Sequence, residues 1–200
     1  MDERDVFVLA DRELLRVVGA IQDEQWGMQL PEWFPRSATQ PDITLREVID
    51  YHAYDDAWVP DMLAGKSMDE VGNTQFDGDL LGGDVKRSFA RLVDTACAAA
   101  LALDDLDRTV HTSFGDCPAR EYLWQVSSFR GLRAHDIAKL LGVETALPEA
   151  LVEGLWDEIA PHAEEWRAIG VYGPAVAVPA DAPLQDRLLA LTGREPDGAV

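Results

Sequence analysis

The chain has 200 residues, 37 acidic against 17 basic, and a formal net charge of −20. This length suits one domain spanning residues 1–200. The negative charge excludes nucleic acid and anionic membranes as expected partners, because both would be repelled. No apolar run approaches the roughly 18 residues that a transmembrane helix needs, and the acidic N-terminus lacks the features of a signal peptide. Cys97 and Cys117 form neither a disulfide scaffold nor a metal-spaced pair. We therefore expect a cytoplasmic protein.

Apolar residues recur at helical spacing along most of the chain. With its caps and glycine stops, this pattern predicts helices at about Val6–Gln25, Thr44–Gly65, Gly83–Leu103, Pro118–Leu141, Pro148–Ile169 and Leu184–Thr192. Pro161 predicts a break in the fifth of these, because proline lacks a backbone donor. Segments 110–114 and 176–178 are strand-like, and 26–42 is predicted to be an ordered, proline-rich loop. The prediction is an all-α four-helix bundle with additional short C-terminal helices.

The second predicted helix carries two polar residues on its apolar face. Thr44 and Glu47 form a capping box that marks its start. His52 and Asp56 lie one turn apart and share a face with residues such as Val48 and Val59. Burying a polar side chain without a hydrogen-bond partner costs about 1–3 kcal/mol of folding free energy, so we expect this pair to have partners or a function. It is a metal-ligand set, a catalytic set or a structural polar network.

The fourth predicted helix repeats the pattern with a positive charge. Arg133 shares an apolar arc with Phe129 and Ile137, Asp136 lies near the edge of that arc, and His135 points to roughly the opposite side. If the second and fourth helices pack together, Arg133 meets His52 and Asp56. A buried guanidinium needs a carboxylate, which Asp56 or Asp136 would supply. A purely structural ion pair is the alternative to a functional site.

Four segments carry a resemblance to a known family: TLREVIDYHAYDDAWVPDMLAG, RTVHTSFGDCPAREYL, LRAHDIAKLLG and YGPAVAVPADAPLQDRLLALTGREP. The last is the most distinctive. Together they make nearly the whole chain similar to the mycothiol-dependent maleylpyruvate isomerase N-terminal group of the DinB-like superfamily. Its closest branch is that of small uncharacterised metal-binding proteins. The resemblance implies a four-helix bundle with a metal site between helices.

The resemblance also implies a site, and this chain departs from it. The family holds a divalent metal, zinc or nickel, through a histidine on the second helix and two residues one turn apart on the fourth. His52 matches the first ligand, but Phe129 and Arg133 fall at the other two positions. Neither side chain can bind a metal cation. In the family, the low-molecular-weight thiol would act as a metal-bound thiolate. Because this chain matches only one of the three metal ligands, we expect a degenerate metal site in which an ionic network replaces the metal.

Three functions remain open. The first is a thiol-dependent isomerase or transferase of the family type. The second is a metal-free binder or atypical enzyme, in which Arg133 recognises an anionic small molecule, Asp56 and Asp136 contribute to binding, and His52 transfers protons. In the third, the polar network fixes helix register and the function lies in a partner surface; the resemblance is compatible with a homodimer.

Overall fold

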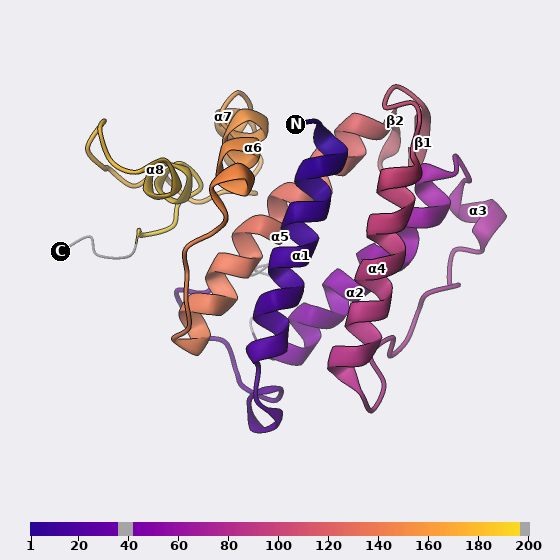
Figure 1. Cartoon of the computed structure of the whole chain (residues 1–200), viewed down its shortest axis with the longest axis horizontal. Coiled ribbons are helices and arrows are strands. Elements are labelled where there is room, and N and C mark those ends of the chain that lie inside the picture. The colour runs from indigo at the N-terminus through magenta and orange to yellow at the C-terminus, as the bar shows by residue number, and fades with distance from the viewer. Residues whose placement is uncertain (36–41, 197–200) are drawn as a thin grey trace.

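The computed structural model describes residues 1–35 and 42–196, and it is predominantly helical (Figure 1). Its long helices are α1 (Glu3–Ala20), α2 (Leu45–Leu63), α4 (Val85–Ala102) and α5 (Ala119–Leu141). Shorter helices are α3 (Met68–Val71), α6 (Glu149–Ile159), α7 (Ala163–Ala168) and α8 (Leu184–Leu191), with a 3-10 turn at Asp23–Gln25. Strands β1 (Thr109–Thr112) and β2 (Gly115–Pro118) pair in antiparallel register, Thr112 opposite Gly115. The predicted all-α class is confirmed.

Local sequence signals explain where the long helices begin and end. Thr44 caps α2: its backbone N–H donates to the Glu47 carboxylate at 2.7 Å, and its hydroxyl accepts from the Glu47 backbone N–H at 3.3 Å. This is the capping box that the sequence predicts. Helix α5 ends at Gly142, whose φ of 66° is the left-handed conformation that glycine adopts without steric cost.

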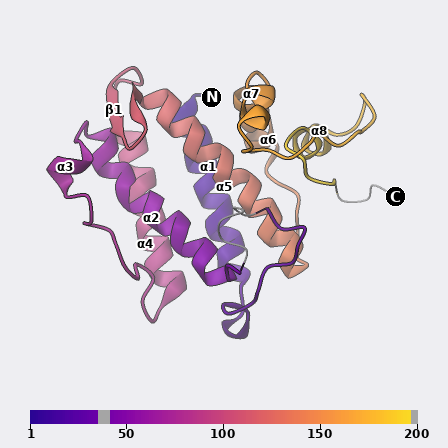
Figure 2. The same cartoon turned by 180° about the vertical axis from the view of Figure 1, so that it is seen from behind.

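The four long helices form a bundle with one loosely closed side. Helix α1 packs extensively against α5 and α4, and α4 packs against α2, whereas α2 and α5 make only a few direct contacts. Helices α6–α8 form a second layer beside α1 and α5, and the β1–β2 hairpin lies at one end of the bundle (Figures 1 and 2). The loosely closed α2–α5 side is where side chains leave room for a cavity.

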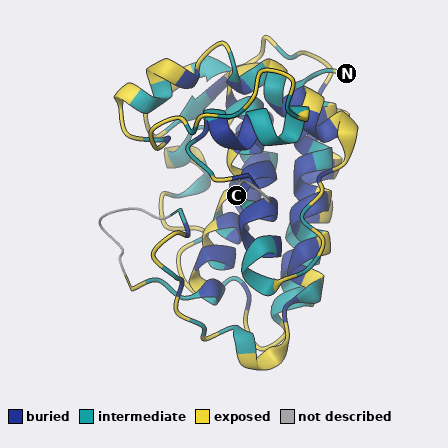
Figure 3. Cartoon of the chain, turned by 90° about the vertical axis from the view of Figure 1, so that its left-hand side faces the viewer, coloured by how far each residue is buried: buried dark blue, intermediate teal, exposed yellow. Residues whose placement is uncertain are grey.

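The core lies between the inner faces of the long helices (Figure 3). Small residues of α5, including Ser127, Gly131 and Ala134, are buried there and let neighbouring helices approach. A Cβ on Gly131 would collide with the Leu155 side chain of α6, so any other residue here would force Leu155 to shift. Across the described ranges, no helix is both long and apolar enough to cross a membrane.

Three predictions about connections have different outcomes. The predicted helix Pro148–Ile169 is two helices, α6 and α7, as Pro161 indicates. The predicted strand at 176–178 is wrong: the backbone N–H of Val176 donates to Ala190 at 2.9 Å, but the segment forms no strand. The predicted loop 26–42 is described only at its ends, because residues 36–41 lie outside the described ranges.

Candidate functional site

A buried ion cluster joins three helices at the centre of the bundle. Arg130 of α5 is fully buried and forms ion pairs with Asp11 of α1 and Asp56 of α2, which are also buried. Its Nε lies 3.1 Å from Oδ1 of Asp56, and its Nη2 reaches the backbone oxygen of His52 at 3.4 Å. A fully buried charge is tolerated only when it is paired, and this one is paired on two sides.

The cluster contains two carboxylates for one guanidinium. Burial raises the pKa of Asp11 well above its usual range, and the nearby Asp56 raises it further. Burial raises the pKa of Asp56 too, against the opposing effect of Arg130. Burial works against the charge of Arg130, but Asp56 and Asp11 outweigh it and raise its pKa. The two carboxylates therefore compete for one buried guanidinium, and the pKa of each lies above its usual value.

The prediction that Arg133 occupies this position is wrong. Arg133 lies at the edge of the bundle, where it donates to the backbone oxygen of Pro35 at 2.7 Å and stacks on Phe34, with its guanidinium 4.8 Å from the ring centroid. The face of α5 that is buried in the core is rotated about the helix axis from the predicted face by about 100°, the angle between successive helix residues. Small residues such as Ser127 and Ala134 form that face, and they contribute little to an apolar pattern.

Asp136 forms the ion pair with Arg133 that the sequence offered as one possibility, but its closer partner is Arg194. Its two carboxylate oxygens accept hydrogen bonds from Arg194 at 2.8 Å and 2.9 Å, and Arg133 lies 3.7 Å away. Asp136 thus ties α5 to the segment after α8 and does not reach Asp56. His135 is buried on another side of α5, where Nδ1 lies 3.2 Å from the backbone oxygen of Thr145.

His52 is buried as predicted, but the residues around it do not fit a metal. Burial holds its pKa well below the usual value, and the charges of Arg130 and Arg133 lower it further, so the ring is neutral at pH 7. Its Nδ1 has no hydrogen-bond partner among the described residues. Within the part of the chain that the structure describes, no three His, Cys, Asp or Glu side chains gather where they could hold a metal ion. The charge of the two guanidinium groups also opposes a divalent cation there.

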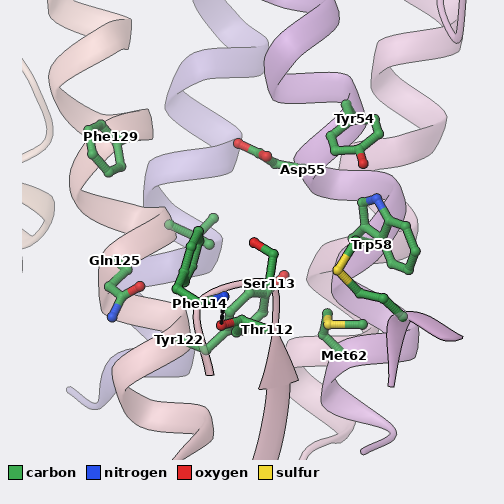
Figure 4. Close-up of a pocket in the computed structure, with 12 residues that line it drawn as sticks. Tyr54, Asp55, Trp58, Met62, Thr112, Ser113, Phe114, Tyr122, Gln125 and Phe129 are labelled. Atoms are coloured by element: carbon green, nitrogen blue, oxygen red, sulfur yellow. Dashed lines mark hydrogen bonds between the residues drawn. The ribbon is translucent and has the colours of Figure 1, made fainter. Parts of the chain in front are cut away.

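A cavity of about 240 Å³ opens between α2, α5 and the tip of the β1–β2 hairpin (Figure 4). Aromatic rings from all three elements form much of its wall: Trp58 from α2, Tyr122 and Phe129 from α5, and Phe114 from the hairpin. Such an apolar enclosure with a few polar groups is typical of small-molecule sites. The cavity lies on the loosely closed side of the bundle, next to the ion cluster.

Asp55 is the charged residue of this cavity, and the sequence analysis did not single it out. Figure 4 shows its carboxylate directed from α2 into the space between α2 and α5. The side chain is exposed to solvent within this cavity. Burial by the cavity walls raises its pKa, Arg130 opposes that shift, and Asp56 adds to it. The sequence signal that could have identified Asp55 is its position between the aromatic residues Tyr54 and Trp58, next to a second aspartate.

A second cavity, of about 730 Å³, lies on the other side of Phe129, which lines both. Arg133 and Arg194 contribute positive charge to its wall. Both guanidinium groups are already engaged, Arg194 with Asp136 and Arg133 with the backbone oxygen of Pro35. His52 and Asp56 therefore lie in the core, whereas Arg133 lines this second cavity, and the three do not form one site.

Scans against protein-family models and curated proteins return no match. Among solved structures, the mycothiol-dependent maleylpyruvate isomerase aligns over 98% of this chain and 90% of its own, with a TM-score of 0.62 and 18% identity. The chain has the fold of that isomerase. An H52A mutant of the isomerase aligns over 97% of this chain and 79% of its own, with a TM-score of 0.58 and 18% identity. At this identity the likeness to the isomerase is one of fold, and it confirms the predicted bundle.

Proposed function

We propose that the protein binds a small organic molecule in the cavity beside Asp55, and that it does so without a metal. The observation that supports this most strongly is the cavity itself, an aromatic enclosure with one carboxylate directed into it. The adjoining Arg130 cluster holds α1, α2 and α5 together, so the walls are fixed before a ligand arrives. A preformed site loses little conformational entropy on binding.

Asp55 is the residue that would do chemistry at this site. A carboxylate with a raised pKa inside a cleft is a candidate general acid or base. His52 is a weaker candidate, because it is buried and does not line this cavity. The proposed enzyme activity is therefore a proton transfer at a bound substrate, and isomerisation is one reaction of that class.

Titration calorimetry with benzyl alcohol, a neutral one-ring probe, tests the binding site. We expect saturable binding by the wild-type protein and its loss in Ser113→Trp, which places an indole in the cavity wall. Thr95→Trp, on the exposed side of α4, is the matched control and should bind as the wild type does. Equal binding by both variants would contradict the assignment, and so would no binding by the wild type.

A thiol-dependent isomerase or transferase is the second candidate, and the shared fold favours it. That activity would require a low-molecular-weight thiol and a metal to activate it. Metal analysis of protein purified without chelators separates the two candidates. Our proposal expects far less than one zinc or nickel ion per chain, and binding of benzyl alcohol that EDTA does not change. Stoichiometric metal that is lost in His52→Ala would support the thiol-dependent enzyme instead.

A further inference from the structure

We propose that the cavity beside Asp55 selects a cation: a small primary amine or quaternary ammonium compound that carries an apolar, ring-sized body. This inference rests on the proposed binding site and adds the chemical class of its ligand. Three features of the cavity support it, namely its charge, its aromatic wall and the exposed ring at its mouth.

The residues that line the cavity carry a net negative charge. Asp55 is the only charged side chain among the described residues that line it, and the other polar groups, such as Gln125 and Ser113, are neutral. The Asp55 carboxylate forms no hydrogen bond or ion pair with any described residue. The nearest cation, Arg130, is fully buried and already paired with Asp11 and Asp56. A ligand cation is thus the missing partner of the Asp55 carboxylate.

The aromatic wall is suited to the same ligand. A ring face carries negative electrostatic potential and attracts an ammonium group within about 6 Å of its centroid. Tyr54 and Trp58 lie side by side on α2, with ring centroids 6.2 Å apart and an interplanar angle of 68°. Tyr122 and Phe129 contribute from α5. Met62 and Met68 complete the apolar part of the wall, where a ligand's uncharged body would pack.

Phe114 explains why the ligand also needs an apolar body. It lies at the hairpin tip with 85% of its surface exposed, and it lines the cavity (Figure 4). The turn that carries it is ordered: the hydroxyl of Thr112 donates to the Gly115 backbone oxygen at 2.8 Å and accepts from the Phe114 N–H at 3.3 Å. An exposed phenyl ring held over a cavity is covered when an apolar ligand enters. The volume of about 240 Å³ limits that ligand to one small ring system.

The experiment compares three one-ring probes by titration calorimetry: benzyltrimethylammonium, benzyl alcohol and phenylacetate. We expect the cation to bind about tenfold more tightly than the neutral probe, which is in the range for a cation–π site with a carboxylate. The anion should bind most weakly. Affinity for the cation should fall as the pH drops through the raised pKa of Asp55, because protonation removes the charge.

Two variants assign the selectivity to Asp55. In Asp55→Asn the affinity for benzyltrimethylammonium should fall about tenfold and lose its pH dependence, so that the preference for the cation over benzyl alcohol disappears. Asp157→Asn removes an exposed carboxylate from α6 and is the matched control, with all affinities unchanged.

The outcomes separate this inference from the proposed function. If benzyl alcohol binds in the cavity but the cation binds no more tightly, or Asp55→Asn leaves the cation's affinity unchanged, the cation inference is wrong and the binding site remains. If no probe binds the wild-type protein, both are wrong.

Discussion

Asp55 and Asp56 are consecutive residues of α2, and they lie in opposite environments. Asp56 is 1% exposed and is paired with Arg130, whereas Asp55 faces a cavity with no cation beside it. The step of about 100° between neighbouring helix residues is enough to separate the two roles. The comparison shows that the partner decides whether an acidic residue stabilises the fold or is available to a ligand.

The largest expected effect is the loss of the central cation. Arg130→Met should lower the free energy of unfolding by about 4 kcal/mol, because it leaves Asp11 and Asp56 buried without their partner. Arg133→Met, on the same helix, should cost only about 1 kcal/mol, since it removes one hydrogen bond, one ring contact and a long ion pair to Asp136, which keeps Arg194 as its partner. Urea unfolding of both variants measures the difference. Equal losses would contradict the assignment of Arg130 as the central residue.

The two neighbouring aspartates should differ almost as clearly. Asp56→Asn should lower the free energy of unfolding by about 3 kcal/mol, because Arg130 loses its charged partner on α2. Asp55→Asn should change it by less than about 0.5 kcal/mol, as expected for an accessible residue without an ion pair. Urea unfolding again measures both, and a destabilised Asp55→Asn variant would mean that its carboxylate is structural.

Glu158 of α6 is a third case, a buried carboxylate with no cation. Neither carboxylate oxygen has a hydrogen-bond partner among the described residues, and burial raises its pKa to about 8, with smaller contributions from Glu3 and Asp157. The folded state therefore binds this proton more tightly than the unfolded state, so stability should fall as pH rises from about 4.5 to about 8. Glu158→Gln should remove this loss and be more stable than the wild type by about 2 kcal/mol at pH 9, but not at pH 4. Urea unfolding at the two pH values checks it, and equal stability at pH 9 would contradict the raised pKa.

The smallest expected change in stability is at the hairpin tip. Phe114→Ala should alter the free energy of unfolding by less than about 0.5 kcal/mol, because the ring packs on little in the free protein. Its effect should appear in binding, where the affinity for benzyl alcohol falls about threefold to tenfold as the ring's contact is lost. Unchanged affinity in calorimetry would place the ligand away from the hairpin.

Much of the fold was predictable because its signals are local. The capping box at Thr44 and Glu47 and the stop at Gly142 depend on neighbouring residues alone, and the structure contains both. The burial of His52 and Asp56 also followed from helical periodicity.

The site was less predictable, because it depends on how helices are turned against one another. The periodicity of α5 favoured Arg133 over Arg130, since the face that packs in the core is lined by Ser127, Gly131 and Ala134. Asp55 was missed for a related reason. A residue beside an apolar stripe is normally solvated, and only the gap between α2 and α5 makes this one part of a cavity.

The most direct test of the central claim is a ¹H–¹⁵N NMR titration of the wild-type protein with benzyl alcohol. The account predicts saturable shifts concentrated on the Trp58 indole N–H and on the backbone of Asp55, Phe114 and Tyr122, with little change at Arg133 or Arg194. Shifts concentrated at Arg133 and Arg194 would place the ligand in the second cavity, and they would contradict the assignment of the Asp55 cavity as the binding site.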